Sequence, residues 1–433
     1  MSQKPSAINI IWLTMILTAT VTAAYTGAMA EVTKASFESA KSAVTLAIGL
    51  IGPMALWLGL MKIAEAGGLM QTVARSLRPV MVRLFPDVPA EHPAMAAMIM
   101  NMAANMLGLG NAATPMGIKA MQELDRLAAE KGTATNAMCL FLAINTSSVT
   151  ILPLGVITVR AAAGATSPAS ILIPSLIATI LSTTVAIVAS KLLSGPDAPL
   201  VTAPSDNTPV DTILPADETS DLHPPSLMGR LFVLALILAF VVGAWLQLSR
   251  QPQLTLLSTA TFDAVSNWLI PMLIAGFLVY GYLRGVKVYE VMTEGAKEGF
   301  TTTVKIIPFM VAIFVAIGMF RASGAMEIMV TLLSPLTESV GMPAEALTMA
   351  MLRPLSGSGA FGLMSEIVTK SPDSFLSFLV STMQGSTETT FYVLAVYFGS
   401  IGITRTRHAL PAALCADAAG VLGSVLICRF WFS

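Results

Sequence analysis

Long apolar stretches dominate the chain, and polar positions are gathered in short runs between them. A transmembrane helix needs about 20 mostly apolar residues. Nine stretches of the sequence meet this requirement: 7–30, 43–63, 135–157, 170–193, 228–248, 267–285, 304–321, 375–400 and 409–431. The pattern predicts an all-α polytopic membrane protein with about nine or ten spans.

Two further apolar stretches, 93–116 and 346–365, are interrupted by glycine and proline, and a hydroxyl-rich segment follows each, at 144–155 and 383–399. Backbone that leaves the helix at membrane depth is tolerated only where it is buried in protein or lines a cavity. Interruptions at matching positions of two halves indicate a transporter binding site. We therefore predict re-entrant hairpins and broken transmembrane helices.

The two halves are separated by residues 195–227, which hold seven prolines, six acids and no Lys or Arg. This composition is typical of a flexible linker, and it divides the chain into domains 1–194 and 228–433. With the N-terminus inside and both hairpins re-entrant, 16 Lys and Arg lie inside and 8 outside, as the positive-inside rule requires. Helix 43–63 then runs opposite to its counterpart 304–321, so the halves are predicted to be inverted repeats.

An amphipathic segment precedes each hairpin, at 66–84 and at 324–339. Their helical period predicts helices that lie in the membrane interface. Pro79 and Pro335 fall at matching places in the two segments, which supports a duplication.

The first apolar stretch has two interpretations. Ala28 to Ala30 resembles the small-residue cleavage site of a signal peptide. The apolar stretch is long enough to span a bilayer, however, and Lys4 is the only basic residue before it. We favour a retained helix.

Composition excludes several classes of function. The chain has 433 residues, 11% of them charged, and a mean hydropathy of +0.76, whereas a soluble domain carries about 25% charged residues. A net charge of −1 provides no basic field for nucleic acid. The three cysteines have no metal-site spacing, and the sequence contains neither a phosphate-binding loop nor a His-Glu-x-x-His motif. We expect no enzymatic activity, cofactor or bound metal.

The first broken stretch combines amides with glycines. Asn101 and Asn105 are four residues apart and share a helix face, and the glycines at 108 and 110 allow a turn. Asn111 and Thr114 are placed to cap a second short helix. The alternative is that these residues serve only tight helix packing. The candidate binding residues of this half are Asn101, Asn105, Asn111, Thr114, Asn145, Ser147 and Ser148.

The second half carries charge at the matching places. Arg353 is predicted to be paired or to reach an aqueous cavity, unless it extends to the interface. Glu388, which we place within a helix, is expected to bind a substrate or coupling cation, or to form a structural pair with Arg353. Asp417 is a proton-relay group or bonds a neighbouring hydroxyl. The candidates of this half are Arg353, Ser356, Ser358, Gln384, Ser386, Thr387 and Glu388, with Glu388 and Asp417 for coupling.

Several long motifs resemble known families. FESAKSAVTLAIGLIGPMALWLGLMKIAEAGG (37–68) and NMAANMLGLGNAATPMGIKAM (101–121) resemble the spore maturation protein A family. PLSGSGAFG (354–362) and STMQGSTETTFYVLAVYFGS (381–400) resemble the spore maturation protein B family. The resemblance implies a natural fusion of the two. It also implies a gated permeation unit, because both families carry the nucleoside-recognition gate domain shared with concentrative nucleoside transporters and ferrous-iron transporters.

Together these patterns predict a transporter or permease for a small polar solute, nucleoside-like or a small anion, gated by the two hairpins. We expect a multi-pass protein of the bacterial inner membrane, a homo-oligomer, whose partners are the lipid bilayer, the solute and a coupling cation. The alternative hypothesis is a non-transporting membrane scaffold that recruits envelope or spore maturation factors through its acidic linker.

Overall fold

The computed structural model describes residues 7–108, 110–195, 225–249 and 259–432. These residues form helices and contain no strand beyond one isolated bridge between Thr133 and Arg405. The first half contains α1 (Ala7–Thr26), α2 (Met29–Ala66), α3 (Leu69–Leu84), α4 (Pro93–Met106), α5 (Gly110–Leu127), α6 (Asn136–Thr146), α7 (Leu154–Ala162), η1 (Pro168–Ile171) and α8 (Leu172–Leu192). The second contains α9 (Leu227–Ser249), α10 (Thr259–Arg284), α11 (Val288–Ala322), α12 (Ala325–Glu338), α13 (Ala344–Leu355), α14 (Gly357–Lys370), α15 (Phe375–Ser386), α16 (Thr390–Gly399) and α17 (Ala409–Phe432).

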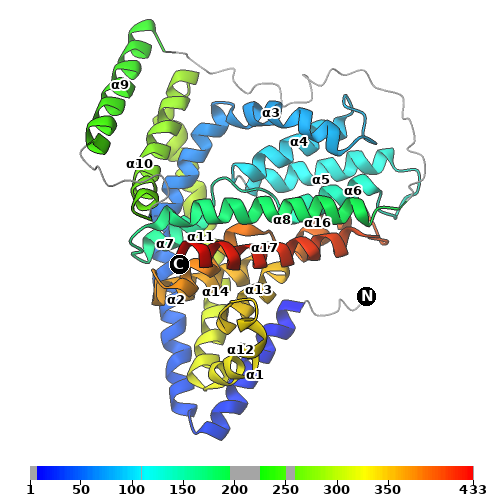
Figure 1. Ribbon diagram of the computed structural model, residues 1–433, viewed down its shortest axis with the longest axis vertical. Helices are drawn as coiled ribbons and strands as arrows, with labels where there is room; N and C mark the ends of the chain where they lie inside the picture. Colours follow the sequence, from blue (N-terminus) through cyan, green and yellow to red (C-terminus); the bar gives the residue numbers. More distant parts are fainter. Residues whose placement is uncertain (1–6, 109, 196–224, 250–258, 433) are drawn as a thin grey trace.

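Helices α2 and α11 form a long antiparallel pair along the vertical axis of Figure 1. A Cβ atom on Gly59 would lie 2.7 Å from the carbonyl oxygen of Met292, and one on Gly318 would overlap the hydroxyl of Ser39. The pairing therefore runs in opposite directions along the two helices. Glycine is needed at these contacts because the backbones approach closely.

Helices α8 and α17 form a second antiparallel pair, which runs across the view in Figure 1. The Ser182 hydroxyl donates a hydrogen bond to the carbonyl oxygen of Ala416 at 2.7 Å. Further along, a Cβ on Gly423 would lie 3.9 Å from the Cα of Ala178. A small residue at each contact allows close helix packing, as is common between membrane helices.

The helix order of α1–α8 repeats in α10–α17, and the contacts between helices repeat with it. Helix α1 packs on α11, and α10 packs on α2. The equivalent helices α2 and α11 are antiparallel, as are α8 and α17, so the two halves are inverted repeats. Helix α9 has no counterpart in the first half, and its Phe240 ring packs against Trp268 of α10 at 5.7 Å.

The two predicted amphipathic helices are present as α3 and α12, and their position in the membrane interface stays a prediction. Each begins directly after a glycine in the left-handed conformation, Gly68 (φ 79°) and Gly324 (φ 85°). The chain bends by 82° between residues 310–322 and 325–335. Pro79 lies as far after Gly68 as Pro335 lies after Gly324, so the two bends are equivalent in sequence and in structure.

Two of the predicted span boundaries are wrong. Helix α2 begins at Met29, well before residue 43, and the first stretch ends at Thr26 because Gly27 turns the chain (φ 74°). Among the described residues, four helices are long and apolar enough to span a membrane, or five if the bent pair at 310–335 is counted. Four of the nine predicted stretches, 7–30, 135–157, 267–285 and 375–400, are not among these helices. Two of them, 135–157 and 375–400, are each divided into two short helices.

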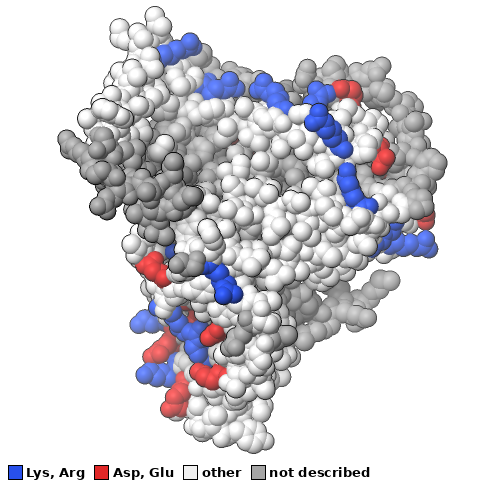
Figure 2. All heavy atoms as spheres, in the orientation of Figure 1, with Lys and Arg blue, Asp and Glu red and all other residues white. Residues whose placement is uncertain are grey.

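Charged side chains are unevenly distributed on the face shown in Figure 2. They lie along the upper edge and right side and in a mixed cluster at the lower left, while the broad area between is almost uncharged. An uncharged belt of this kind suits contact with lipid. The predicted linker at 195–227 lies largely outside the described residues.

Candidate functional site

Two interrupted helices form the centre of the site. The first break separates α6 from α7 at residues 147–153, and the second separates α15 from α16 at residues 387–389. Thr387 and Thr389 are extended (ψ 167° and 94°), a conformation that β-branched residues favour. Pro153 ends the first break, and a proline disfavours helix in the residue before it. Glu388 therefore lies in a break between helices, and our placement of it within a helix was wrong.

The second break is hydrogen-bonded to the helix that leads into the first break. The backbone N–H of Glu388 donates to the carbonyl oxygen of Thr146 at 2.8 Å, which joins the second break to the end of α6. The Thr183 hydroxyl of α8 donates to the carbonyl oxygen of Ser147. The C-terminus of α6 and the N-terminus of α16 consequently lie side by side. Such ends present the partial charges of the helix dipoles, which bind ions and polar groups.

Each hairpin places its turn against the break of its own half. The Ile151 N–H donates to the carbonyl oxygen of Met106 at 3.0 Å, and a Cβ on Gly108 would lie 3.0 Å from the Leu152 carbonyl oxygen. In the second half, a Cβ on Gly357 would lie 2.7 Å from the Thr389 hydroxyl. The glycines in these turns are needed because a side chain would separate the hairpin from the break.

The predicted amides of the first half form one buried, uncharged network. Asn105 Nδ2 donates to Asn145 Oδ1 at 2.9 Å, and Asn101 Nδ2 donates to the Ala113 carbonyl oxygen at 2.7 Å. The Tyr397 hydroxyl accepts from Asn101 at 3.1 Å and donates to Asn145 at 3.3 Å. The network fixes both arms of the first hairpin and α6 relative to one another.

Tyr397 was missed by sequence reasoning, and it comes from the other half of the chain. A Cβ on Gly117 would overlap its hydroxyl, so the glycine in α5 makes room for the tyrosine. A tyrosine in an apolar helix ordinarily indicates core packing. The only available signal was the position of Gly117 in an amphipathic helix, which does not identify its partner.

The second half holds a charged network in the equivalent place. The Arg353 guanidinium is 3% exposed and donates to the Thr389 hydroxyl at 3.1 Å and to the Thr387 carbonyl oxygen. Its Nη2 lies 3.7 Å from Glu388 Oε2. The alternative that Arg353 reaches the interface is therefore wrong. The two members of the pair differ in exposure: the Arg353 side chain is buried, whereas the Glu388 side chain is 50% exposed.

Asp417 of α17 extends this network. Its Oδ2 accepts a hydrogen bond from the Thr390 hydroxyl at 2.6 Å, which confirms the predicted bond to a neighbouring hydroxyl. The other oxygen, Oδ1, has no partner among the described residues, and neither do Ser148 Oγ and Gln384 Oε1. Buried polar atoms are nearly always hydrogen-bonded, so these atoms have hydrogen-bonding capacity that a water molecule or a polar ligand would use.

The predicted hydroxyls of the second hairpin have a structural role as well. Ser356 caps α14, because its Oγ accepts a hydrogen bond from the Gly359 N–H at 3.0 Å, and Ser358 lies 3.5 Å from it. The hydroxyls of Ser147 and Ser386 donate to carbonyl oxygens of their own helices at 2.9 Å. Hydrogen bonds of this kind occupy the hydroxyl proton and leave lone pairs free.

The predicted cap of the hairpin's second helix is wrong. Helix α5 begins at Gly110, so Thr114 and Pro115 lie inside its first turns. Thr114 is half-buried. The side chain of Asn111 lies outside the described residues.

A second buried arginine was also missed. Arg160 of α7 is 2% exposed and donates to the Pro372 carbonyl oxygen at 3.2 Å and to the Ser377 hydroxyl at 3.4 Å. Its guanidinium lies 5.6 Å from the centre of the Phe378 ring. Arg160 joins α7 of the first half to α15 of the second, and thus adds to the contact between the repeats.

No three His, Cys, Asp or Glu side chains gather as metal ligands within the described part of the chain. The breaks instead offer amides, hydroxyls, helix ends and one Arg–Glu pair. This geometry defines a class of protein: an all-α membrane protein whose inverted repeats meet at two helix breaks.

Comparison with known proteins gives the family. The Gate family, described as nucleoside recognition, matches residues 47–193 and 303–404, which contain both breaks and both hairpins. The chain belongs to this family. It is similar to spore maturation protein A of Bacillus subtilis (strain 168), 45% identical over 175 residues, which are 40% of this chain and 89% of that protein. It is also similar to spore maturation protein B of the same organism, 44% identical over 173 residues, which are 39% of this chain and 97% of that protein.

The two relatives match separate halves, so the chain is a fusion of two proteins that exist separately elsewhere. No solved structure matches the chain.

Proposed function

We propose that the chain is a transporter or permease for a small polar solute in the bacterial inner membrane, and that the solute binds between the two breaks. The half-exposed carboxylate of Glu388 carries the proposal, because it lies 3.7 Å from a buried guanidinium in a largely apolar protein. A charge of this kind is costly in a membrane protein and ordinarily faces a cavity or a polar pathway.

The chemistry of the surrounding groups favours a polar ligand. The amides of Asn105 and Asn145 lie on the first-half side, and the Arg353–Glu388 pair lies on the second-half side. The Glu388 backbone bond to Thr146 brings these two sides together. A solute with hydroxyl or ring nitrogen groups would take hydrogen bonds from both halves. Glu388 would contact either the solute or a coupling cation.

A liposome experiment tests this assignment. The purified full-length chain, reconstituted and screened against nucleosides, small dicarboxylates and metal ions, is expected to accumulate one class of solute. Glu388→Gln keeps the shape of the side chain and removes its charge, and we expect uptake to fall by about 100-fold or more, since charge-assisted hydrogen bonds contribute about 1.5–3 kcal/mol each and a coupling role adds to this.

The matched control is Glu91→Gln. Glu91 also pairs with an arginine, at 2.7 Å from Arg78, but both side chains are exposed at the surface. Uptake is expected to be unchanged in this variant. Full uptake in Glu388→Gln would contradict the site assignment, and no uptake of any solute by the wild-type chain would contradict transport itself.

The acidic linker supports a second candidate function, that of a membrane scaffold. Six acids and no basic residue between 195 and 227 would suit docking of a basic partner. Replacing residues 198–224 by a Gly/Ser sequence of equal length separates the two functions. Transport would survive the replacement, whereas recruitment of a partner would be lost.

A further inference from the structure

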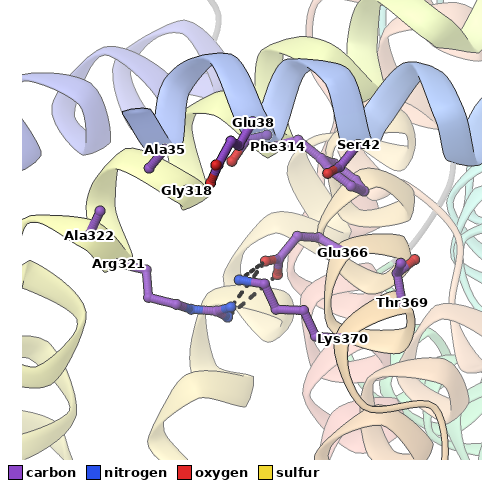
Figure 3. Close-up of a pocket in the computed structure, with 11 residues that line it drawn as sticks. Ala35, Glu38, Ser42, Phe314, Gly318, Arg321, Ala322, Glu366, Thr369 and Lys370 are labelled. Atoms are coloured by element: carbon purple, nitrogen blue, oxygen red, sulfur yellow. Dashed lines mark hydrogen bonds and ion pairs between the residues drawn. The ribbon is translucent and has the colours of Figure 1, made fainter. Parts of the chain in front are cut away.

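A polar cavity of about 350 Å³ lies between α2, α11 and α14, away from the two breaks (Figure 3). Glu366 forms its inner wall and is 5% exposed. Arg321 of α11 binds both carboxylate oxygens, with Nη1 at 3.0 Å from Oε1 and Nη2 at 3.4 Å from Oε2. Lys370 Nζ lies 2.6 Å from the same Oε1. Two cations therefore share one buried acid.

This arrangement has more positive charge than the carboxylate needs. A single bidentate arginine already satisfies a buried carboxylate. The second cation adds charge that the acid does not neutralise, and the two cationic side chains repel each other at this distance. Arg321 and Lys370 are 33% and 51% exposed, so both retain N–H groups that are free to donate toward the open side of the cavity.

Hydroxyl groups face the same space from α2. Ser39 and Ser42 line the cavity, and neither makes a hydrogen bond to another described residue. Gly318 of α11 makes room for Ser39, since a Cβ there would overlap the serine oxygen. Glu38 lies at the opening and is 66% exposed, with Lys34 at 3.8 Å. This acid is solvated and partly neutralised, so it opposes an anion only weakly.

A second cavity of about 650 Å³ adjoins the first and shares Glu38, Ser42 and Thr369 with it. Its lining adds the cation of Lys41 and apolar residues, among them Leu46 and Ala162. Together the linings of the two cavities contain three cations and two acids, which leaves a net charge of +1 beside an apolar wall.

We propose that this composite cavity binds a phosphate group, held by Arg321, Lys370 and the serine hydroxyls of α2. Arginine with lysine and hydroxyl donors is the usual set of phosphate ligands in proteins. The phosphate comes from a phospholipid headgroup, whose acyl chains the apolar wall accommodates, or from a free phosphate. In either case the bound group joins the α2–α11 pair to the second arm of the hairpin, α14.

Binding measurements on the purified full-length chain test this site. Dioctanoyl phosphatidylglycerol, inorganic phosphate and dioctanoylglycerol are titrated separately in a neutral detergent, and binding is followed by native mass spectrometry. We expect the phosphate-bearing lipid or inorganic phosphate to bind saturably and dioctanoylglycerol not to bind. Saturation by inorganic phosphate identifies a free phosphate as the source, and saturation by the lipid alone identifies the headgroup.

Lys370→Gln provides the decisive variant, because it leaves the Arg321–Glu366 pair intact. We expect its dissociation constant to rise about tenfold, the effect of losing one charge-assisted hydrogen bond, and Ser42→Ala to weaken binding to a smaller extent. The control is Lys131→Gln, a 60% exposed lysine that pairs with Asp125 and lines neither cavity, which should leave binding unchanged. Equal affinity of wild type and Lys370→Gln, or no saturable binding of either phosphate ligand, would overturn the proposal.

Discussion

The two helix breaks have the same backbone plan and different chemistry. Asn105 and Arg353 both lie near the end of the first arm of their hairpins, where Asn105 bonds Asn145 at the end of α6 and Arg353 bonds Thr389 in the second break. The first half uses neutral amides, whereas the second uses a guanidinium and a carboxylate. When the N-cap residues Thr135 of α6 and Ser374 of α15 are aligned, Val149 matches Glu388, and it is half-buried and apolar. The polar groups thus lie in similar places in the two halves, but they are neutral in the first half and charged in the second.

The difference teaches that the two sides of the site are specialised. Burying hydrogen-bonded amides costs much less than burying a charge, so the first network suits holding its helices in fixed positions. A buried charge is stable only with its partners in place, so we expect the second network to be the one that responds to a bound solute.

Arg353→Met is expected to have the largest effect on stability. It removes two hydrogen bonds to Thr387 and Thr389 and leaves Glu388 without its cation, for a loss of about 3 kcal/mol. The comparison variant is Asn105→Leu, for which we expect about 1 kcal/mol. Unfolding in detergent, monitored by circular dichroism, measures both. Equal losses would show that the two networks do not differ in the way we describe.

Gly117→Ala tests the contact that joins the halves on the first-half side. A methyl group there would overlap the Tyr397 side chain, and overpacking of this kind costs about 2 kcal/mol. Gly155→Ala is the control, because its nearest neighbour, a Phe361 ring carbon, would be 3.7 Å away. The second change Tyr397→Ala should remove the penalty of Gly117→Ala. Additive losses in the double variant would contradict the contact.

Tyr397→Phe has a smaller expected effect. It deletes the hydroxyl that bridges Asn101 and Asn145 and should destabilise the protein by about 1 kcal/mol. The control is Tyr392→Phe on the same helix. The Tyr392 side chain is 55% exposed, so loss of its hydroxyl leaves no buried partner unpaired. Equal thermal unfolding of the two tyrosine variants would contradict the proposed bridge.

His92 gives the smallest effect, a weak pH dependence. It lies in the loop before α4, and its Nδ1 accepts a hydrogen bond from the Ala94 N–H at 3.1 Å. Burial, as the largest cause, lowers the pKa of His92 below 6.5, opposed by the charge of Glu123. The unfolded chain therefore binds more protons than the folded one in this pH range. The contribution of His92 to the free energy of unfolding is fully present above pH 6.5 and is lost as the pH falls through the lowered pKa. His92→Asn keeps a cap acceptor and should flatten the pH dependence of the melting temperature between pH 7 and pH 5. An unchanged slope would contradict the role of His92.

The sequence predicted the plan of the fold better than the chemistry of its contacts. The glycine-containing hairpin turns and the amphipathic helices at Pro79 and Pro335 follow from local pattern, because glycine, proline and helical periodicity act within a few residues. The division of α15 from α16 at Glu388 was not predicted, since threonines in an apolar run are compatible with a continuous helix. Tyr397 and Arg160 were missed because their partners lie in the opposite half, and a single sequence does not report such pairing.

Access of water to both breaks distinguishes a solute site shared by the two halves from two unconnected breaks. In a chain whose three cysteines are replaced, single cysteines at Val149 and Ser358 are treated with a membrane-impermeant thiol reagent in proteoliposomes, with Ala178→Cys in the buried α8–α17 contact as the unreactive control. We predict that both positions react and that a transported solute protects both. Reaction at neither position, or protection at only one of them, would contradict a shared solute site between the halves.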